Sequence, residues 1–77
     1  MKIAIITDTH LSSKNIALIE SIFDQAIAYL KKEDIQNLFH AGDWFTSRTG
    51  QSVEVLVATQ RILHKLDDAG IDLHIIA

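Results

Sequence analysis

Two short runs of consecutive apolar residues constrain the fold of this 77-residue chain more than any other feature. They span Ile3–Thr7 and Asn37–Ala41, and a third run, Asp72–Ala77, follows near the other end. The first run does not alternate with polar residues, so both faces of that strand have side chains to bury. That pattern is typical of parallel strands covered by helices. We therefore expect three buried parallel strands.

Amphipathic helices are predicted between these runs. The first extends from about Lys14 to Lys32, and its last two lysines suit the negative end of a helix. The second extends from about Ser52 to Ala69, and Gly70 stops it. The apolar positions, spaced by three and four, are Ile16, Ile19, Phe23, Ala26, Ile27 and Leu30 in the first helix and Val55, Ile62, Leu63 and Leu66 in the second. The order β-α-β-α-β predicts an α/β fold with a parallel sheet and right-handed crossovers.

Composition limits the chain to one small domain. The net charge of −3 gives no global basic field for nucleic acid, although a local groove stays compatible with it. The chain has no cysteine and no run of the roughly 20 apolar residues that a membrane span needs, so we expect a cytoplasmic protein with no membrane partner. Two helices leave one face of the sheet without a cover. We therefore expect residues 1–77 to be the N-terminal part of a larger domain.

Polar residues directly follow the first two strands, as Asp8-Thr9-His10 and Gly42-Asp43. If the backbone stays extended after the first strand, Asp8 and His10 point the same way. Parallel pairing brings Asp43 to the same edge, where open α/β sheets place ligands. Each residue alone is equally well explained as a turn or capping residue, but together they favour a metal or phosphate site. Oxygen and imidazole donors suit Mn, Fe or Zn.

Other notable side chains have simpler structural explanations. We expect His40 and His74 to pack within their strands with one hydrogen bond each, and His64 to be solvated. Trp44 and Phe45 could stack on a nucleic-acid base, but a hydrophobic plug at the edge of the sheet is the simpler interpretation.

Two features of the loops also have alternative interpretations. Arg48 is placed to contact a phosphate, although a solvated loop arginine explains it as well. Ser12 and Ser13 precede the first helix and are candidates to cap it.

The two polar motifs resemble those of a known superfamily. Thr7-Asp8-Thr9-His10-Leu11 and Ala41-Gly42-Asp43-Trp44-Phe45 are similar to the Asp-x-His and Gly-Asp motifs of calcineurin-like metallophosphoesterases. Leu11, the Ser47-Arg48 turn and the segment Leu66–Ile71 are most similar to the SbcD-type double-strand-break-repair nucleases, which include phage recombination nucleases. The short loop after His10 and Thr49-Gly50, where Pro-Ser is common, depart from that group and bear on DNA contacts. The resemblance implies that Asp8 and His10 bind one metal and that Asp43 bridges two.

The resemblance further implies a hydrolase of phosphate esters, specifically the nuclease subunit of a DNA repair or recombination exonuclease. Its cofactors would be two divalent metal ions, Mn or alternatively Fe or Zn, and its partners DNA and an ATPase subunit. The third motif, Gly-Asn-His-Asp, is expected directly beyond Ala77. No catalytic residue is then expected within residues 1–77, and the isolated chain would be nearly inactive and would self-associate through its open sheet face.

Two other functions stay open at this point. One is a phosphatase or small-molecule phosphodiesterase of the same superfamily. The other is a non-catalytic α/β binding module in which Asp8 and Asp43 have structural roles.

Overall fold

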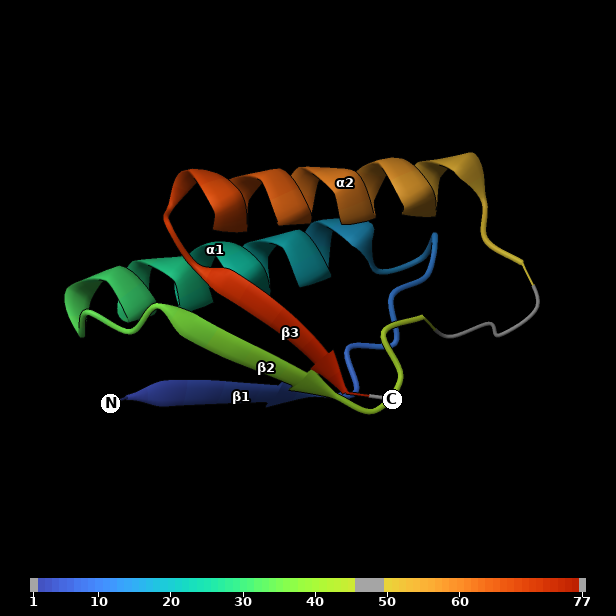
Figure 1. The fold of residues 1–77 in the computed structure, drawn as a ribbon. Helices are drawn as coiled ribbons and strands as arrows, with labels where there is room; N and C mark the ends of the chain where they lie inside the picture. Colours follow the sequence, from blue (N-terminus) through green and yellow to red (C-terminus); the bar gives the residue numbers. More distant parts are fainter. Residues whose placement is uncertain (1, 46–49, 77) are drawn as a thin grey trace.

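Three parallel strands form the sheet, and a helix connects each strand to the next (Figure 1). The computed structural model describes residues 2–45 and 50–76. Its elements are β1 (Ile3–Thr7), α1 (Ile16–Lys32), β2 (Asn37–Ala41), α2 (Val53–Asp68) and β3 (Asp72–Ile76). The strand order is β1-β2-β3, and Thr7, Ala41 and Ile76 lie in register at the carboxyl edge. The predicted β-α-β-α-β fold is confirmed.

Both helices lie on the same face of the sheet (Figure 1). Each connection moves in the same direction across the sheet, so two right-handed crossovers must pass over one face. The core fills the space between this face and the helices. Its buried side chains are Leu11, Ile19, Phe23, Leu30, Ile35, Leu38, Trp44, Val55, Ile62, Leu66 and Ile71.

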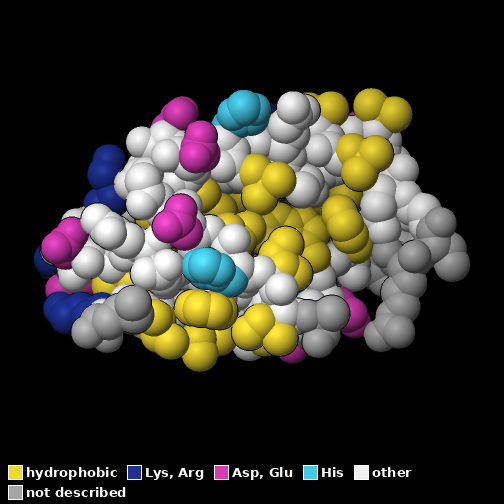
Figure 2. Space-filling model, viewed as in Figure 1, with side chains coloured by type: hydrophobic (Ala, Val, Ile, Leu, Met, Phe, Trp, Pro, Cys, Tyr) yellow, Lys and Arg dark blue, Asp and Glu magenta, His cyan; other side chains and the backbone are white. Residues whose placement is uncertain are grey.

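The opposite face of the sheet has no cover in the described residues. Ile3, Ile5 and Ile76 are 50%, 65% and 51% exposed. On the same face Phe39 stacks on His74, with ring centroids 4.6 Å apart. Hydrophobic side chains are visible below the sheet and between α2 and β3 (Figure 2). The prediction of an uncovered face is confirmed, because both helices cover the same one. The pattern of the first run, which suits a strand buried on both faces, is met on one face only.

The helix ends differ in how well the sequence predicts them. Ser52, near which the second helix was expected to begin, is the N-cap of α2 and accepts the Val55 amide hydrogen at 3.2 Å. Helix α1 begins at Ile16, and its N-cap is Asn15 rather than a serine, with no side-chain cap bond. The prediction of a serine cap is therefore wrong, because the helix begins two residues later than expected. The side-chain amide of Asn15 bonds to His10 and Ser12 in the preceding loop and not to the first turn of the helix.

The outer surfaces of the two helices carry an exposed leucine and two ion pairs that join the helices. Leu63, predicted to pack, is 42% exposed because it lies about 100° around α2 from the buried Ile62. Exposed ion pairs of 2.7 and 2.9 Å join the helices, Arg61 with Glu20 and Lys65 with Asp24. Such pairs contribute little stability. Within the described residues, neither helix is long and apolar enough to cross a membrane.

Candidate functional site

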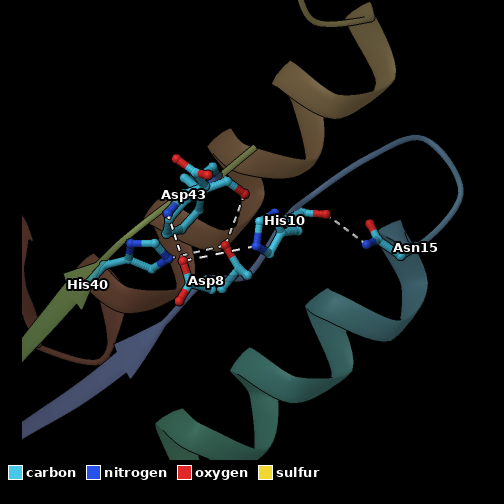
Figure 3. Close-up of polar contacts among 7 residues, drawn as sticks. Asp8, His10, Asn15, His40 and Asp43 are labelled. Carbon is cyan, nitrogen blue, oxygen red and sulfur yellow. Dashed lines mark hydrogen bonds and ion pairs between the residues drawn. The ribbon is translucent and has the colours of Figure 1, made fainter. Parts of the chain in front are cut away.

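The parallel pairing of β1 with β2 continues beyond the strands into the loops that carry the two motifs. We call residues 8–11 the first motif loop and residues 42–45 the second motif loop. Three backbone hydrogen bonds follow one another along them: Asp8 N–H to Ala41 O (3.1 Å), His10 N–H to Asp43 O (3.2 Å) and Leu11 N–H to Trp44 O (2.7 Å). A final parallel bridge pairs Leu11 with Phe45. The two loops are thus held side by side at the carboxyl edge (Figure 3).

Asp8 and His10 do come together, but not for the predicted reason. Their φ angles are +50° and +49°, so the first motif loop is left-handed at both positions and not extended. His10 Nε2 lies 4.0 Å from Asp8 Oδ1, and both side chains are about half exposed. Two ligand atoms of one metal ion, each about 2.1 Å from it, are at most about 4.2 Å apart. At 4.0 Å the pair is under that upper limit but wider than the roughly 3.4 Å between neighbouring ligands of a tetrahedral ion, so the two side chains would have to move closer to bind one ion together.

Asp43 reaches the same edge, as predicted, but its recorded link to Asp8 is through the backbone. The Asp43 amide donates a hydrogen bond of 3.1 Å to Asp8 Oδ1. Among the described residues, no group of three or more histidine, aspartate or glutamate side chains is placed to hold a metal ion. Asp8 and His10 are near one another, and metal binding by this pair stays a prediction. The bridging role of Asp43 stays a prediction.

Gly42 makes the contact between the two motif loops possible. Its φ of +83° is one that residues with side chains rarely adopt. A Cβ atom at this position would overlap the Asp8 carboxylate. Position 42 therefore excludes a side chain twice, by backbone conformation and by lack of space. This gives a physical reason for the Gly-Asp order in the second motif.

A buried polar group lies behind the motif loops. His40 is fully buried, and its Nε2 is 3.2 Å from the hydroxyl of Thr9, which donates to Trp44 O at 3.0 Å. Burial lowers the pKa of His40, and the negative charge of Asp8 opposes that shift only partly. The prediction that His40 packs with one hydrogen bond is confirmed.

Trp44 is part of the core and not of an open groove. It is 9% exposed, and its ring packs against those of Phe23 and His40 at centroid distances of 5.4 and 4.9 Å. The indole nitrogen donates to Thr59 Oγ1 at 3.3 Å. Phe45 is half-buried against the same core. The hydrophobic-plug interpretation of these two residues is confirmed.

The sequence motifs do not point to Thr9 or Asn15, yet both organise the site. Asn15 donates from Nδ2 to His10 O at 2.9 Å and accepts the Ser12 amide hydrogen at 2.7 Å. It thereby fixes the backbone on the far side of His10 (Figure 3). The available signal was an asparagine just before a helix, which ordinarily indicates a cap.

The remaining candidate residues lie apart from this site. His64 is exposed, as predicted. His74 makes its one hydrogen bond, 3.1 Å to Asn37 Oδ1, but on the open face of the sheet. Ser47, Arg48 and Thr49 lie outside the described residues.

Comparisons of the chain with protein-family models, with curated proteins and with solved structures gave no match.

Proposed function

We propose that this chain carries the first metal-binding motifs of a metal-dependent phosphoesterase, with DNA phosphodiesters as the substrate class. Asp8 and His10 would hold one divalent ion, Mn being the first choice, and Asp43 would bridge to a second. When bound, such ions supply Lewis-acid activation of water and of the phosphate group. A cytoplasmic location and an ATPase partner belong to the same proposal.

The observation that carries the proposal is the placement of a carboxylate and an imidazole, two kinds of side chain that bind metals, at the carboxyl edge of the sheet. Asp8 and His10 lie 4.0 Å apart at the carboxyl ends of parallel strands. One lone pair of Asp8 Oδ1 accepts the Asp43 amide hydrogen, and Asp8 Oδ2 leaves a second oxygen for an ion. The described residues supply two ligands where a catalytic metal commonly has three. The proposal therefore requires at least one more ligand, from Asp43 or from outside the described residues.

A small groove lies beside the first motif loop. Its volume is about 190 Å³, and it is lined by Leu11, Ser12, Ser13, Gly50, Gln51, Ser52 and Val55. None of these described lining residues is acidic or basic, so the groove neither repels a phosphate nor offers it a charged partner. Side-chain hydroxyls and amides are common partners of nucleic-acid phosphates.

One observation favours the second candidate, a non-catalytic module. Asp8 already has a structural role because its Oδ1 accepts the Asp43 amide hydrogen. A strand-end aspartate that closes a turn in this way needs no metal. The two candidates differ in whether the carboxylate charge of Asp8, and not only its acceptor oxygen, is required.

Asp8→Asn separates charge from hydrogen bonding because asparagine retains an acceptor oxygen. Asp72→Asn is the matched control, since it removes the same charge at the amino edge of the sheet. We expect Mn²⁺ to broaden the amide NMR signals of His10 and Leu11 in the wild-type chain. Asp8→Asn should weaken Mn²⁺ binding at least about tenfold, and Asp72→Asn should not.

Hydrolysis is tested on the protein as its gene encodes it. Asp8→Asn should lower Mn-dependent cleavage of duplex DNA by at least about 100-fold. Retained cleavage, or Mn²⁺ broadening that is identical in the wild-type and Asp8→Asn chains, would refute the metallophosphoesterase proposal. Wild-type stability of Asp8→Asn with no Mn²⁺ binding in either chain would favour the non-catalytic module.

A further inference from the structure

Thr9 sits at the centre of a hydrogen-bonded chain that joins β2 to both motif loops. Its hydroxyl lies 3.2 Å from His40 Nε2 and 3.0 Å from Trp44 O. Trp44 O also accepts the Leu11 amide hydrogen at 2.7 Å. The chain therefore ends on the same carbonyl that closes the backbone ladder between the loops.

The directions of these bonds follow from the chemistry of the groups. A carbonyl oxygen can only accept, so the single hydroxyl hydrogen of Thr9 goes to Trp44 O. The hydroxyl must then accept from His40, which places a hydrogen on Nε2. His40 Nδ1 is buried with no hydrogen-bond partner in the described structure. This arrangement assigns His40 the neutral Nε2–H tautomer.

We propose that His40 and Thr9 form a positioning pair that fixes the spacing of the two motif loops. In this arrangement His40, on β2 inside the core, donates a hydrogen bond to the Thr9 hydroxyl. Thr9 in turn donates to Trp44 O, and so ties the first motif loop to the second. Thr9 lies between Asp8 and His10 in the sequence. Its hydrogen bonds to His40 and to Trp44 O therefore also fix the backbone between these two candidate ligands. Bonds in such a series strengthen one another in a buried setting.

The pair answers a structural need of the site. Asp8 and His10 both adopt left-handed backbone conformations, which are costly for residues other than glycine. Their side chains are about half exposed, so little packing holds them in place. The hydrogen bonds of the half-buried Thr9 to the buried His40 and to Trp44 O supply the constraint that packing does not. The inference rests on the proposed function only for its metal-binding readout.

Thr9→Val tests the pair because valine keeps the shape of threonine and removes the hydroxyl. It leaves the His40 donor without its recorded partner. Thr9→Ser keeps the hydroxyl and is the rescue variant. Thr59→Val is the matched control: it removes the recorded acceptor of the Trp44 indole but touches neither loop ladder.

The first readout is hydrogen exchange of the His10 and Leu11 amides, measured by NMR. Thr9→Val should speed their exchange about tenfold relative to the middle of α2, since losing one buried hydrogen bond has about that effect. Thr9→Ser should stay close to wild type, as should Thr59→Val. Equal exchange of these amides in Thr9→Val and wild type would overturn the proposal.

The second readout is the ring nitrogen spectrum of His40. Long-range proton–nitrogen correlations should show a protonated Nε2 and an unprotonated Nδ1 at neutral pH. A protonated Nδ1 would mean that Thr9 donates to His40, and the proposal would fail. Both readouts apply to the chain without metal.

Mn²⁺ binding separates this inference from the proposed function. If wild type binds Mn²⁺ at the first motif loop, Thr9→Val should weaken binding about tenfold and Thr9→Ser should restore it. If wild type binds none but the exchange and tautomer results hold, the proposed function fails and the positioning pair stands. If Mn²⁺ binds equally to wild type and Thr9→Val, the positioning pair has no effect on the site and the inference is overturned.

Discussion

The two faces of the sheet are built from the same three strands but have opposite surroundings. On the covered face, Leu38 and His40 are 2% and 0% exposed beneath the helices. On the open face, Ile3 and Ile5 are 50% and 65% exposed. Leu38 and His40 lie on β2 and the two isoleucines on the neighbouring β1. The hydrophobicity of these side chains does not account for the difference in exposure between the two faces. The only buried polar residue among those described is a histidine on the covered face, and isoleucines occupy the open one.

Topology explains this distribution where hydrophobicity does not. Strand order β1-β2-β3 with right-handed crossovers places both helices on one face, whatever side chains the other face carries. The residues of a strand therefore determine which of its faces could be buried, and the connections between strands determine which face the helices cover. The buried His40 is accommodated because Thr9 satisfies one of its ring nitrogens.

The largest expected effect is the loss of stability on truncating a side chain on the covered face, compared with the same truncation on the open face. Leu38→Ala on the covered face should lower the free energy of unfolding by about 2–5 kcal/mol, because it removes buried contacts and leaves a cavity. Ile5→Ala on the open face should change it by no more than about 0.5 kcal/mol, since that side chain is mostly in solvent. Urea unfolding followed by circular dichroism measures both. Equal losses would show that the open face is covered in solution.

The next effect concerns pH and the buried histidine. Burial lowers the pKa of His40 in the folded chain below its ordinary value of 6.5. As the pH falls below 6.5, the unfolded chain takes up a proton at this residue that the folded chain resists. The free energy of unfolding should therefore decrease with falling pH in that range, and the His40 contribution should be complete above it.

His40→Gln removes the titrating ring and keeps an amide donor for Thr9. The variant should lose part of the decrease in unfolding free energy between about pH 6.5 and the lowered folded-state pKa, as measured by urea unfolding at several pH values. Stability at neutral pH will fall because glutamine fills the ring space poorly, so the slope with pH is the informative quantity. A slope identical to wild type would mean that the ring takes up its proton equally well in the folded state.

The sequence predicts the regular elements of the molecule better than it predicts the loops between them. Strands and helices are predictable because local apolar periodicity determines them, as the matching bounds of β1, β2 and β3 show. The single hydrogen bond of His40 was also predictable, since its strand position implies packing, and burial of Trp44 followed from an apolar side chain at the edge of the sheet. The uncovered face followed from counting helices.

The geometry of the motif loops was not predictable in the same way. The left-handed backbone at Asp8 and His10 depends on hydrogen bonds to the second motif loop, whose residues are far away in the sequence. Thr9 and Asn15 act through backbone carbonyls, which carry no sequence signature. The meeting of Asp8 with Asp43 at one edge followed from parallel topology, but the contact through a backbone amide did not.

The smallest expected effect on stability, and the most direct test of the open face, is Ile5→Lys. This substitution should change the unfolding free energy by no more than about 0.5 kcal/mol because the side chain is 65% exposed. Exposed contiguous apolar surface promotes association, so the wild-type chain should show a mass above that of a monomer in light scattering as concentration rises. A lysine on this face should shift that mass toward the monomer. Gln60→Lys, on the outer side of α2, adds the same charge elsewhere and should leave association unchanged. A wild-type chain that stays monomeric at all concentrations would contradict this prediction and show that Ile3, Ile5 and Ile76 tolerate water without a partner.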